Sequence, residues 1–193
     1  VIRPITESNI WDWSKEYRHI APKTHTGLSG IAIESVDGGI IEQVTFNNIS
    51  MEGIITPIFI CLNHRRMNQH SGQSGIIRNL LFSNITAKAE GIIPTLIAGT
   101  PTGRITDITL RDITVEHAGG EKAMTKSLPE NLKGYPENRM YGKENPAGGL
   151  YIRHADNILI ENFHIRQRNT DERPSIFLDD ATDIHLSLIH ISE

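Results

Sequence analysis

The chain has 193 residues, a formal net charge of −4 and 38% hydrophobic residues. This length can bury one continuous core, while the weakly acidic, well-mixed charge gives no basic surface for nucleic acid. No apolar run is long enough to span a bilayer. Cys61 is the only cysteine, which excludes a disulfide within the chain, and its place in an apolar strand favours a packed side chain over a nucleophile.

One short pattern recurs along the chain, and each copy follows a separate apolar segment. The pattern begins with an amide or carboxylate, alternates apolar residues, and ends with Asn or Asp before a large apolar residue. It occupies residues 43–49, 79–85, 107–113 and 157–163, and a fifth copy begins at Asp183. The preceding apolar segments are residues 30–34, 57–61, 95–98, 149–153 and 174–178. Because alternation is the period of a strand with one buried face, each repeat predicts two or more short strands.

Unequal spacing around a constant pattern indicates one structural unit with loops of variable length between its copies. Stacked units of this kind predict an all-β fold, a parallel β-helix in which equivalent side chains form ladders. The recurring polar residues are expected at turns, where Asn and Asp tolerate a left-handed backbone and amides can bond along the stack. We therefore interpret four residues as structural: Asn48, Asn84, Asp112 and Asn162.

Two long excursions interrupt the repeats, at residues 63–74 and 118–148. Loops of this length in a compact domain are usually functional or mobile. Arg65 and Arg66 lie in the first, and Arg153 and His154 follow a strand after the second. Guanidinium groups bind carboxylates in bidentate geometry, so the three arginines, with His154 beside them, are the candidate ligands for an acidic sugar. Solvated loop charges without a ligand are the alternative interpretation.

Other candidate groups have weaker patterns. Trp11 and Trp13 would share a strand face, where indole rings either stack on a sugar or are buried in the core. His25 stands alone in a Thr-His-Thr-Gly turn, which favours a structural role. The nine histidines never fall into ligand spacing with each other or with Cys61, and no glycine-rich phosphate loop occurs, so neither a metal nor a cofactor is expected.

Both ends of the chain lack the capping element with which a solenoid covers its terminal core. The chain begins at Val1 within strand-like sequence and without a signal peptide. Residues 186–193 resemble the translation of a transposase adapter used in sequencing libraries, and position 188 is Leu where the repeat requires Asn or Asp. We therefore expect residues 1–185 to be a fragment of a longer protein and residues 186–193 to be a non-native tail. A degenerate final coil is the alternative.

Several blocks of the sequence, taken in order, resemble one enzyme family. They are residues 24–39, 57–60, 135–137 and 149–154. Together they resemble the C-terminal half of bacterial glycoside hydrolase family 28, the polygalacturonase-like enzymes, over most of residues 24–183. The resemblance implies a right-handed single-stranded parallel β-helix of the pectin-lyase-like type, present in part as residues 1–185. It also implies inverting hydrolysis of a pectic, uronic-acid-containing polysaccharide by a secreted or periplasmic protein.

The same resemblance predicts that the catalytic acids are missing. Inverting glycosidases need two carboxyl groups roughly 6.5–9.5 Å apart, one to protonate the leaving oxygen and one to activate water. In the family these acids come from Asn-Thr-Asp and Asp-Asp motifs followed by Gly-His-Gly, and none of the three has a match here. Asp179 and Asp180 come too late in the chain and are interpreted as a turn pair. The family's substrate-binding Arg-Ile-Lys falls on residues 32–34, where Ala32 and Glu34 reverse the charge.

We therefore expect a glycoside hydrolase whose catalytic residues lie outside this chain, so that the chain as written cleaves neither polygalacturonate nor rhamnogalacturonan. A non-catalytic carbohydrate-binding or structural β-helix is the alternative, because fold alone does not determine activity. A polysaccharide lyase ranks third, since the sequence shows neither the Ca²⁺-binding acid clusters nor the Arg base that it needs.

Overall fold

The computed structural model describes residue 2 and residues 27–65, 75–142 and 144–192. In these ranges the chain forms strands and one short 3₁₀ helix, as the all-β prediction requires. The strands are β1 (Gly27–Ser35), β2 (Ile40–Leu62), β3 (Ile76–Ala89), β4 (Thr95–Ala98), β5 (Ile105–Gly119), β6 (Leu150–Asn169) and β7 (Ile176–Ser192), and the 3₁₀ helix is η2 (Asn138–Tyr141). No helix in the described ranges has the length and apolarity needed to cross a membrane.

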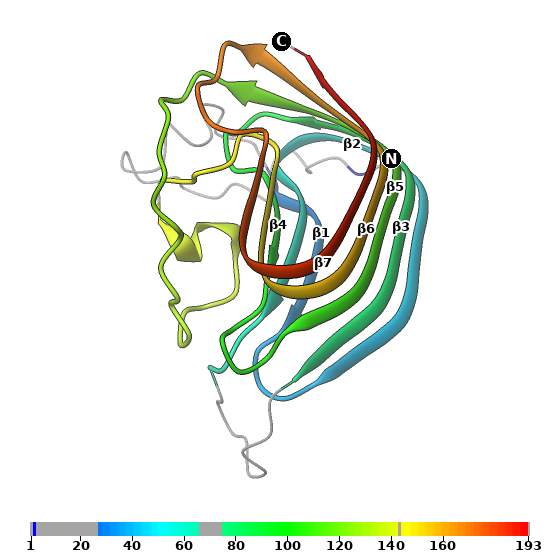
Figure 1. Ribbon diagram of the computed structural model, residues 1–193, viewed down its shortest axis with the longest axis vertical. Coiled ribbons are helices and arrows are strands. Elements are labelled where there is room, and N and C mark those ends of the chain that lie inside the picture. The colour runs from blue at the N-terminus through cyan, green and yellow to red at the C-terminus, as the bar shows by residue number, and fades with distance from the viewer. Residues whose placement is uncertain (1, 3–26, 66–74, 143, 193) are drawn as a thin grey trace.

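All pairings between these strands are parallel, and they form two ladders. The first ladder joins β1, the end of β2, β4, the start of β6 and the start of β7. The second joins the start of β2, β3, β5 and the remainder of β6 and β7. Figure 1 shows β2, β6 and β7 as long bent ribbons, because each contributes to both ladders. Successive repeats of the sequence therefore lie beside one another in the sheet.

The bends within the second ladder occur at residues with a left-handed backbone. Ten positions, five in each of two rows, have φ between 51° and 59°. The rows are Gln43, Asn79, Asp107, Asn157 and Asp183, and then Asn48, Asn84, Asp112, Asn162 and Leu188. The left-handed backbone predicted at the four recurring Asn and Asp residues is confirmed, but these residues bend continuous strands instead of lying at turns between strands. Asn and Asp suit these positions because other side chains with a Cβ are strained there.

Side-chain bonds connect neighbouring coils at these corners. The Asn162 amide donates to Asp112 (2.7 Å), and the Asn157 amide donates to Asp107 (2.6 Å). The Asn84 amide instead donates to Asn47 (3.0 Å), one residue before the equivalent corner. The expected bonding along the stack is thus found between the coils of β5 and β6 and, with a shifted partner, between those of β2 and β3.

The main core lies on the inward face of both ladders and consists of stacked aliphatic side chains. Ile60, Ile97 and Ile152 are in register in the first ladder, and all three are fully buried. Phe46 and Phe82 stack in the second, with ring centroids 4.9 Å apart. Burying one such side chain contributes about 1.5–3 kcal/mol. Alternating apolar residues therefore form strands here because stacking removes one whole face of every coil from water.

The last strand, β7, differs from its neighbours in exposure. Residues 186–192 continue the second ladder and pair with β6 from Ile160 onward. The inward row of β6 is buried because strands flank it on both sides, whereas Leu186 and Ile191, which pair with Ile160 and Ile165 of that row, are exposed on β7. Leu188 also occupies a left-handed corner. The origin of residues 186–193 as a non-native tail stays a prediction.

Candidate functional site

The outward face of the first ladder carries two rows of side chains whose exposure changes along the stack. The rows are Ala32, Phe59, Leu96, Tyr151 and Phe177, and then Glu34, Cys61, Ala98, Arg153 and Asp179. In both rows the residue on β1 is accessible to solvent, while the members on β2, β4 and β6 are almost fully buried. The accessible part of this face therefore lies at its β1 and β7 ends.

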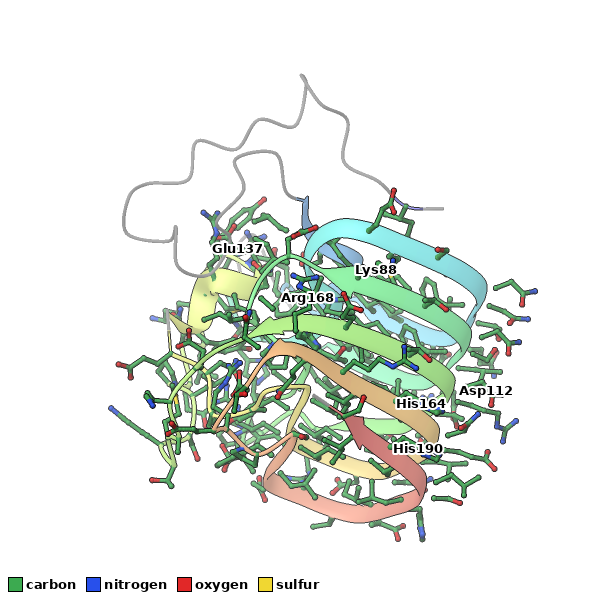
Figure 2. The ribbon with its side chains drawn as sticks, turned by 90° about the horizontal axis from the view of Figure 1, so that it is seen from above. Lys88, Asp112, Glu137, His164, Arg168 and His190 are labelled. Atoms are coloured by element: carbon green, nitrogen blue, oxygen red, sulfur yellow. The ribbon has the colours of Figure 1, made fainter. Side chains whose placement is uncertain are left out.

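A long segment between β5 and β6, residues 120–149, covers the middle of this face, and we call it the strap. Its Leu128, Tyr141 and Ala147 are buried against the outward rows in a second apolar cluster. Figure 1 shows the strap and η2 on the side of the molecule that bears β1 and β4. Figure 2 shows Glu137 on this side, whereas Asp112, His164 and His190 lie on the opposite side. The predicted excursion is thus a packed cover rather than an open loop.

Arg153 holds the strap in place. Its side chain is 1% exposed, and the guanidinium donates to the carbonyl oxygens of Leu128 (2.7 Å) and Pro129 (3.3 Å). The same group lies 5.1 Å from the centroid of the Tyr141 ring. The structure therefore gives Arg153 a different role from the predicted sugar contact, because its charge is used to bind strap carbonyls.

His154 joins three segments at the edge of the strap. Its Nδ1 lies 2.5 Å from an Asp180 carboxylate oxygen and its Nε2 lies 2.9 Å from a Glu130 oxygen. The backbone of His154 is left-handed, with φ of 46°, and the side chain is buried. Its imidazole is thus held between β7 and the strap rather than presented to solvent.

The Asp179–Asp180 pair lies within β7, so the prediction of a turn pair is wrong, although Asp180 has a left-handed backbone. Asp180 has φ of 50°. Hydrogen bonds from His154 and then Arg104 hold the pKa of Asp180 below its usual range. Asp179 accepts a hydrogen bond from the Tyr151 hydroxyl (2.7 Å). Both carboxylates therefore link β7 to residues of earlier coils.

Cys61 is packed beneath the strap, as predicted. It is fully buried, with its Sγ 3.8 Å from Met140 Sδ and 3.7 Å from the Tyr141 hydroxyl. Burial raises the pKa of the Cys61 thiol to about 12. A thiol in this state carries little thiolate at neutral pH and is a poor nucleophile.

The β1 end of the face has a different character, and its polar groups are accessible. Glu34 is half-buried, and burial together with the nearby Glu137 charge raises the pKa of its carboxyl. Residues 34–37, with Gly39 and Ile41, line a cavity of about 260 Å³ at this end. Ala32 is exposed one step along the same strand. This is where the family's Arg-Ile-Lys motif would lie.

Two arginines at this end are each paired with a carboxylate. Arg65 forms an ion pair with Asp37, in which Nε lies 3.4 Å from Oδ1, and its guanidinium lies 5.9 Å from the Tyr135 ring centroid. Arg139 forms an ion pair with Glu137 at the start of η2. Arg65 is thus placed at an accessible edge, but its charge is already matched by Asp37.

The strap is anchored to the start of β1. The Asn138 side-chain amide donates to the Leu28 carbonyl (2.5 Å) and to the Thr56 hydroxyl (2.9 Å). These bonds bring Tyr135 and Glu137 to the β1 end, a contact that no sequence spacing predicts. The mixture of aromatic and charged residues in 135–142 was the only signal available in the sequence.

The remaining candidates lie outside the described residues. They are Arg66, Trp11, Trp13 and His25. Within the described residues, no three His, Cys, Asp or Glu side chains are gathered as metal ligands would be.

Comparison with known proteins identifies the family. The family model described as glycosyl hydrolases family 28 matches residues 23–134, which is more than half of the chain. No curated protein matches the chain, and no solved structure does. The matched region includes β1 with its accessible outward face, β2 to β5, and the first part of the strap. The chain therefore belongs to glycosyl hydrolases family 28.

Proposed function

We propose that this chain is part of a polygalacturonase-like glycoside hydrolase that acts on a pectic or related polysaccharide by inverting hydrolysis. Membership of the family supports a polysaccharide substrate. The two parallel ladders support a β-helix, for which we propose the right-handed, single-stranded, pectin-lyase-like form present in part as residues 1–185. The same membership supports a secreted or periplasmic location.

The observation that carries this proposal is the accessible outward face of β1 inside the matched region. Ala32 and Glu34 point outward there, while Ile31 and Ile33 point into the core. Their equivalents on β2, β4 and β6 are covered by the strap. A polysaccharide that contacts this ladder would therefore reach it at the β1 or β7 end, and of these only β1 lies inside the matched region.

We propose further that the catalytic acids belong to coils outside this sequence. The carboxylates of Asp179 and Asp180 bond Tyr151, His154 and Arg104, which leaves them badly placed to activate water. Glu137 is neutralised by Arg139. The described part of the chain thus supports a binding role for β1, with proton transfer carried out elsewhere in the enzyme.

Two measurements on the purified chain test the proposal. Affinity electrophoresis in gels that contain pectin should show retardation relative to gels without it. Reducing-sugar assays on polygalacturonate and rhamnogalacturonan should show no release above a control without protein. Sugar release would refute the absence of catalytic acids, and unretarded migration would refute the binding role.

A non-catalytic carbohydrate-binding or structural β-helix is the second candidate. The observation that favours it is the strap, which buries the outward face of β2, β4 and β6. The sequence of the reading frame upstream of residue 1 separates the two candidates. Paired Asp motifs on adjoining coils are expected for the hydrolase and are not expected for the non-catalytic module.

A further inference from the structure

The two ends of the strap meet at one buried polar cluster, which we call the strap base. Its members are each at most 8% exposed, and they are His117 near the end of β5, Gln167 near the end of β6, Asn145 near the end of the strap, and Asp171 and Arg173 between β6 and β7. His117 and Gln167 are in register on neighbouring strands. The strap begins directly after β5, so the strap base lies where the strap leaves the ladders.

An ion pair in the strap base holds both ends of the strap. At the first end, Asp171 accepts a hydrogen bond from the Glu121 N–H (3.4 Å), and the Glu172 N–H donates to the Glu121 carbonyl (2.9 Å). At the second end, Arg173 donates to the Asn145 carbonyl (3.2 Å) while it remains paired with Asp171. Both side chains of this ion pair are fully buried. One small site therefore fixes where the strap leaves the ladders and where it returns.

His117 is the member of the strap base that lacks good hydrogen bonds. Its imidazole is fully buried and faces the backbone of Gly149 at the end of the strap, but neither ring nitrogen has a hydrogen bond of normal geometry within the described residues. The Gln167 side-chain nitrogen beside it is unpaired in the same sense. A Cβ on Gly148 would lie 2.2 Å from that nitrogen. The returning end of the strap is therefore packed directly on these side chains and separates them from bulk water.

The surroundings of His117 disfavour its charged form. Burial, followed by the positive charges of Arg173 and Arg168, lowers the pKa of His117 to about 3, while Asp171 acts in the opposite direction. In an opened or unfolded chain the pKa of a histidine is about 6.5. Between these two values, protons bind preferentially to a state in which His117 has left the strap base.

The other charged groups at the strap base have partners that do not involve His117. Arg168 on β6 lies 3.2 Å from Glu116 on β5 and 3.6 Å from Glu90, which follows β3. Hydrogen bonds from Arg173 bring the pKa of Asp171 below its usual range although burial raises it, so Asp171 stays ionised at pH 4.5. His117 is thus the member of the strap base whose charge changes between pH 7 and pH 4.5 once the strap opens.

We propose that the strap is a cover that opens in acid and that His117 is its switch. Protonation of the imidazole releases both ends of the strap and exposes the outward face of β2, β4 and β6. Because the closed strap holds His117 neutral, the closed state is fully favoured above about pH 6.5 and is weakened as pH falls toward the lower pKa. Each pH unit in this interval raises the ratio of open to closed chains about tenfold. Opening requires no substrate, so it holds or fails independently of the proposed function.

Cys61 reports whether the strap is closed, because it is fully buried against Met140 and Tyr141 of the strap. The purified chain is treated with 2,2′-dipyridyl disulfide, which reacts with thiols in acid as well as at neutral pH, in steps from pH 7 to pH 4.5. Each rate is divided by the rate of the urea-unfolded chain at the same pH, so that ionisation of the free thiol cancels. With a pKa of about 6.5 in the open state and about 3 in the closed state, this ratio should rise about 70-fold over the range. Far-UV circular dichroism should stay unchanged, since the ladders remain formed.

Variants identify the group that takes up the proton. His117→Gln and His117→Leu remove the titrating ring with a polar and an apolar side chain, and in either variant the ratio should change less than about threefold over the same range. His185→Gln makes the same chemical change at an exposed position of β7 and should keep the full rise. His154→Gln removes the histidine held between Glu130 and Asp180 at the edge of the strap, and it should also keep the rise.

Several results would overturn the proposal. The reactivity ratio of the wild type would be independent of pH if the strap did not open in acid. A rise that persists in a folded His117 variant, or that disappears in His154→Gln, would assign the proton to another group. Loss of the circular dichroism signal in parallel with the rise would show that the whole fold opens rather than the strap. Pectin retardation is unaffected by any of these results, so the proposed function is tested separately.

Discussion

Asn162 offers a direct test of why Asn and Asp recur in this sequence. Its backbone is left-handed (φ 51°), its amide donates to Asp112 (2.7 Å), and its side-chain oxygen lies 2.9 Å from His164 Nε2. Replacing Asn162 by Ala removes the side-chain bonds and places a Cβ in a strained conformation. Replacing it by Gly removes the same bonds without that strain, so the difference between the two variants reports the backbone alone.

The expected free energies of unfolding follow from these two contributions. Loss of the exposed side-chain bonds costs about 1 kcal/mol in either variant. The left-handed backbone costs Ala about 1–2 kcal/mol, whereas Gly loses roughly 0.5–1 kcal/mol through its more flexible unfolded chain. Asn162→Gly should therefore be more stable than Asn162→Ala by about 0.5–1 kcal/mol.

Urea unfolding followed by far-UV circular dichroism measures this difference. It appears as a shift in the urea concentration at the midpoint, while the dependence of the unfolding free energy on urea concentration stays the same. The control is the pair Arg111→Ala and Arg111→Gly on β5, where the backbone is not left-handed. There Gly should be the less stable variant, so the order of Ala and Gly reverses between the two positions. If Asn162→Ala is at least as stable as Asn162→Gly, the corner explanation of the recurring Asn is wrong.

Three further predictions concern other contacts. Leu188→Asn should raise the unfolding free energy by about 1 kcal/mol in the same urea assay, because Leu188 is exposed and left-handed; an unchanged midpoint would contradict this. Asp171→Asn should cost about 3 kcal/mol, since it leaves the fully buried Arg173 unpaired. Burial raises the pKa of Asp171, but hydrogen bonds from Arg173 outweigh this and bring it below its usual range. The stability that the ion pair contributes is therefore fully present above about pH 4, the pKa of Asp171 in the unfolded chain. As pH falls through the pKa of Asp171 in the folded chain, the difference in unfolding free energy between wild type and Asp171→Asn should decrease. Cys61 should react with a thiol reagent at mildly alkaline pH at least about 100-fold more slowly in the folded chain than in urea, and equal rates would show that the strap does not cover it.

The fold could be predicted from the sequence to the extent that each element repeats. Alternating apolar residues locate the strands, because only one face of a stacked coil is buried, and the Asn and Asp positions locate the corners. Periodicity did not show that β2, β6 and β7 continue through both ladders. A left-handed residue bends a strand without ending its hydrogen bonding, so a turn expected between strands is a corner within one strand.

The candidate site was less predictable, because its contacts join residues far apart in sequence. Arg153 was recognised as a charged residue after a strand, but its partners are the carbonyl oxygens of Leu128 and Pro129, and carbonyls have no signature in sequence. The strap itself has no strand or helix period, so its packing against Cys61 could not be read from alternation. The replacement of the family's Lys by Glu34 was visible in the sequence, because Glu34 lies within a block that resembles the family.

The strap explains how a repetitive fold acquires one distinctive end. Every coil presents an outward face of the same shape, so repetition alone would give a long groove of equivalent positions. The strap covers the middle of that face, where its Leu128 and Tyr141 are buried. The buried Arg153 holds the strap there by donating to the carbonyl oxygen of Leu128. The same segment carries Tyr135 and Glu137 to β1, because Asn138 bonds Leu28 and Thr56. Covering one part of the face and adding side chains to another are therefore consequences of the same segment, and a change that loosens Arg153 should alter the surroundings of Glu34 without touching it.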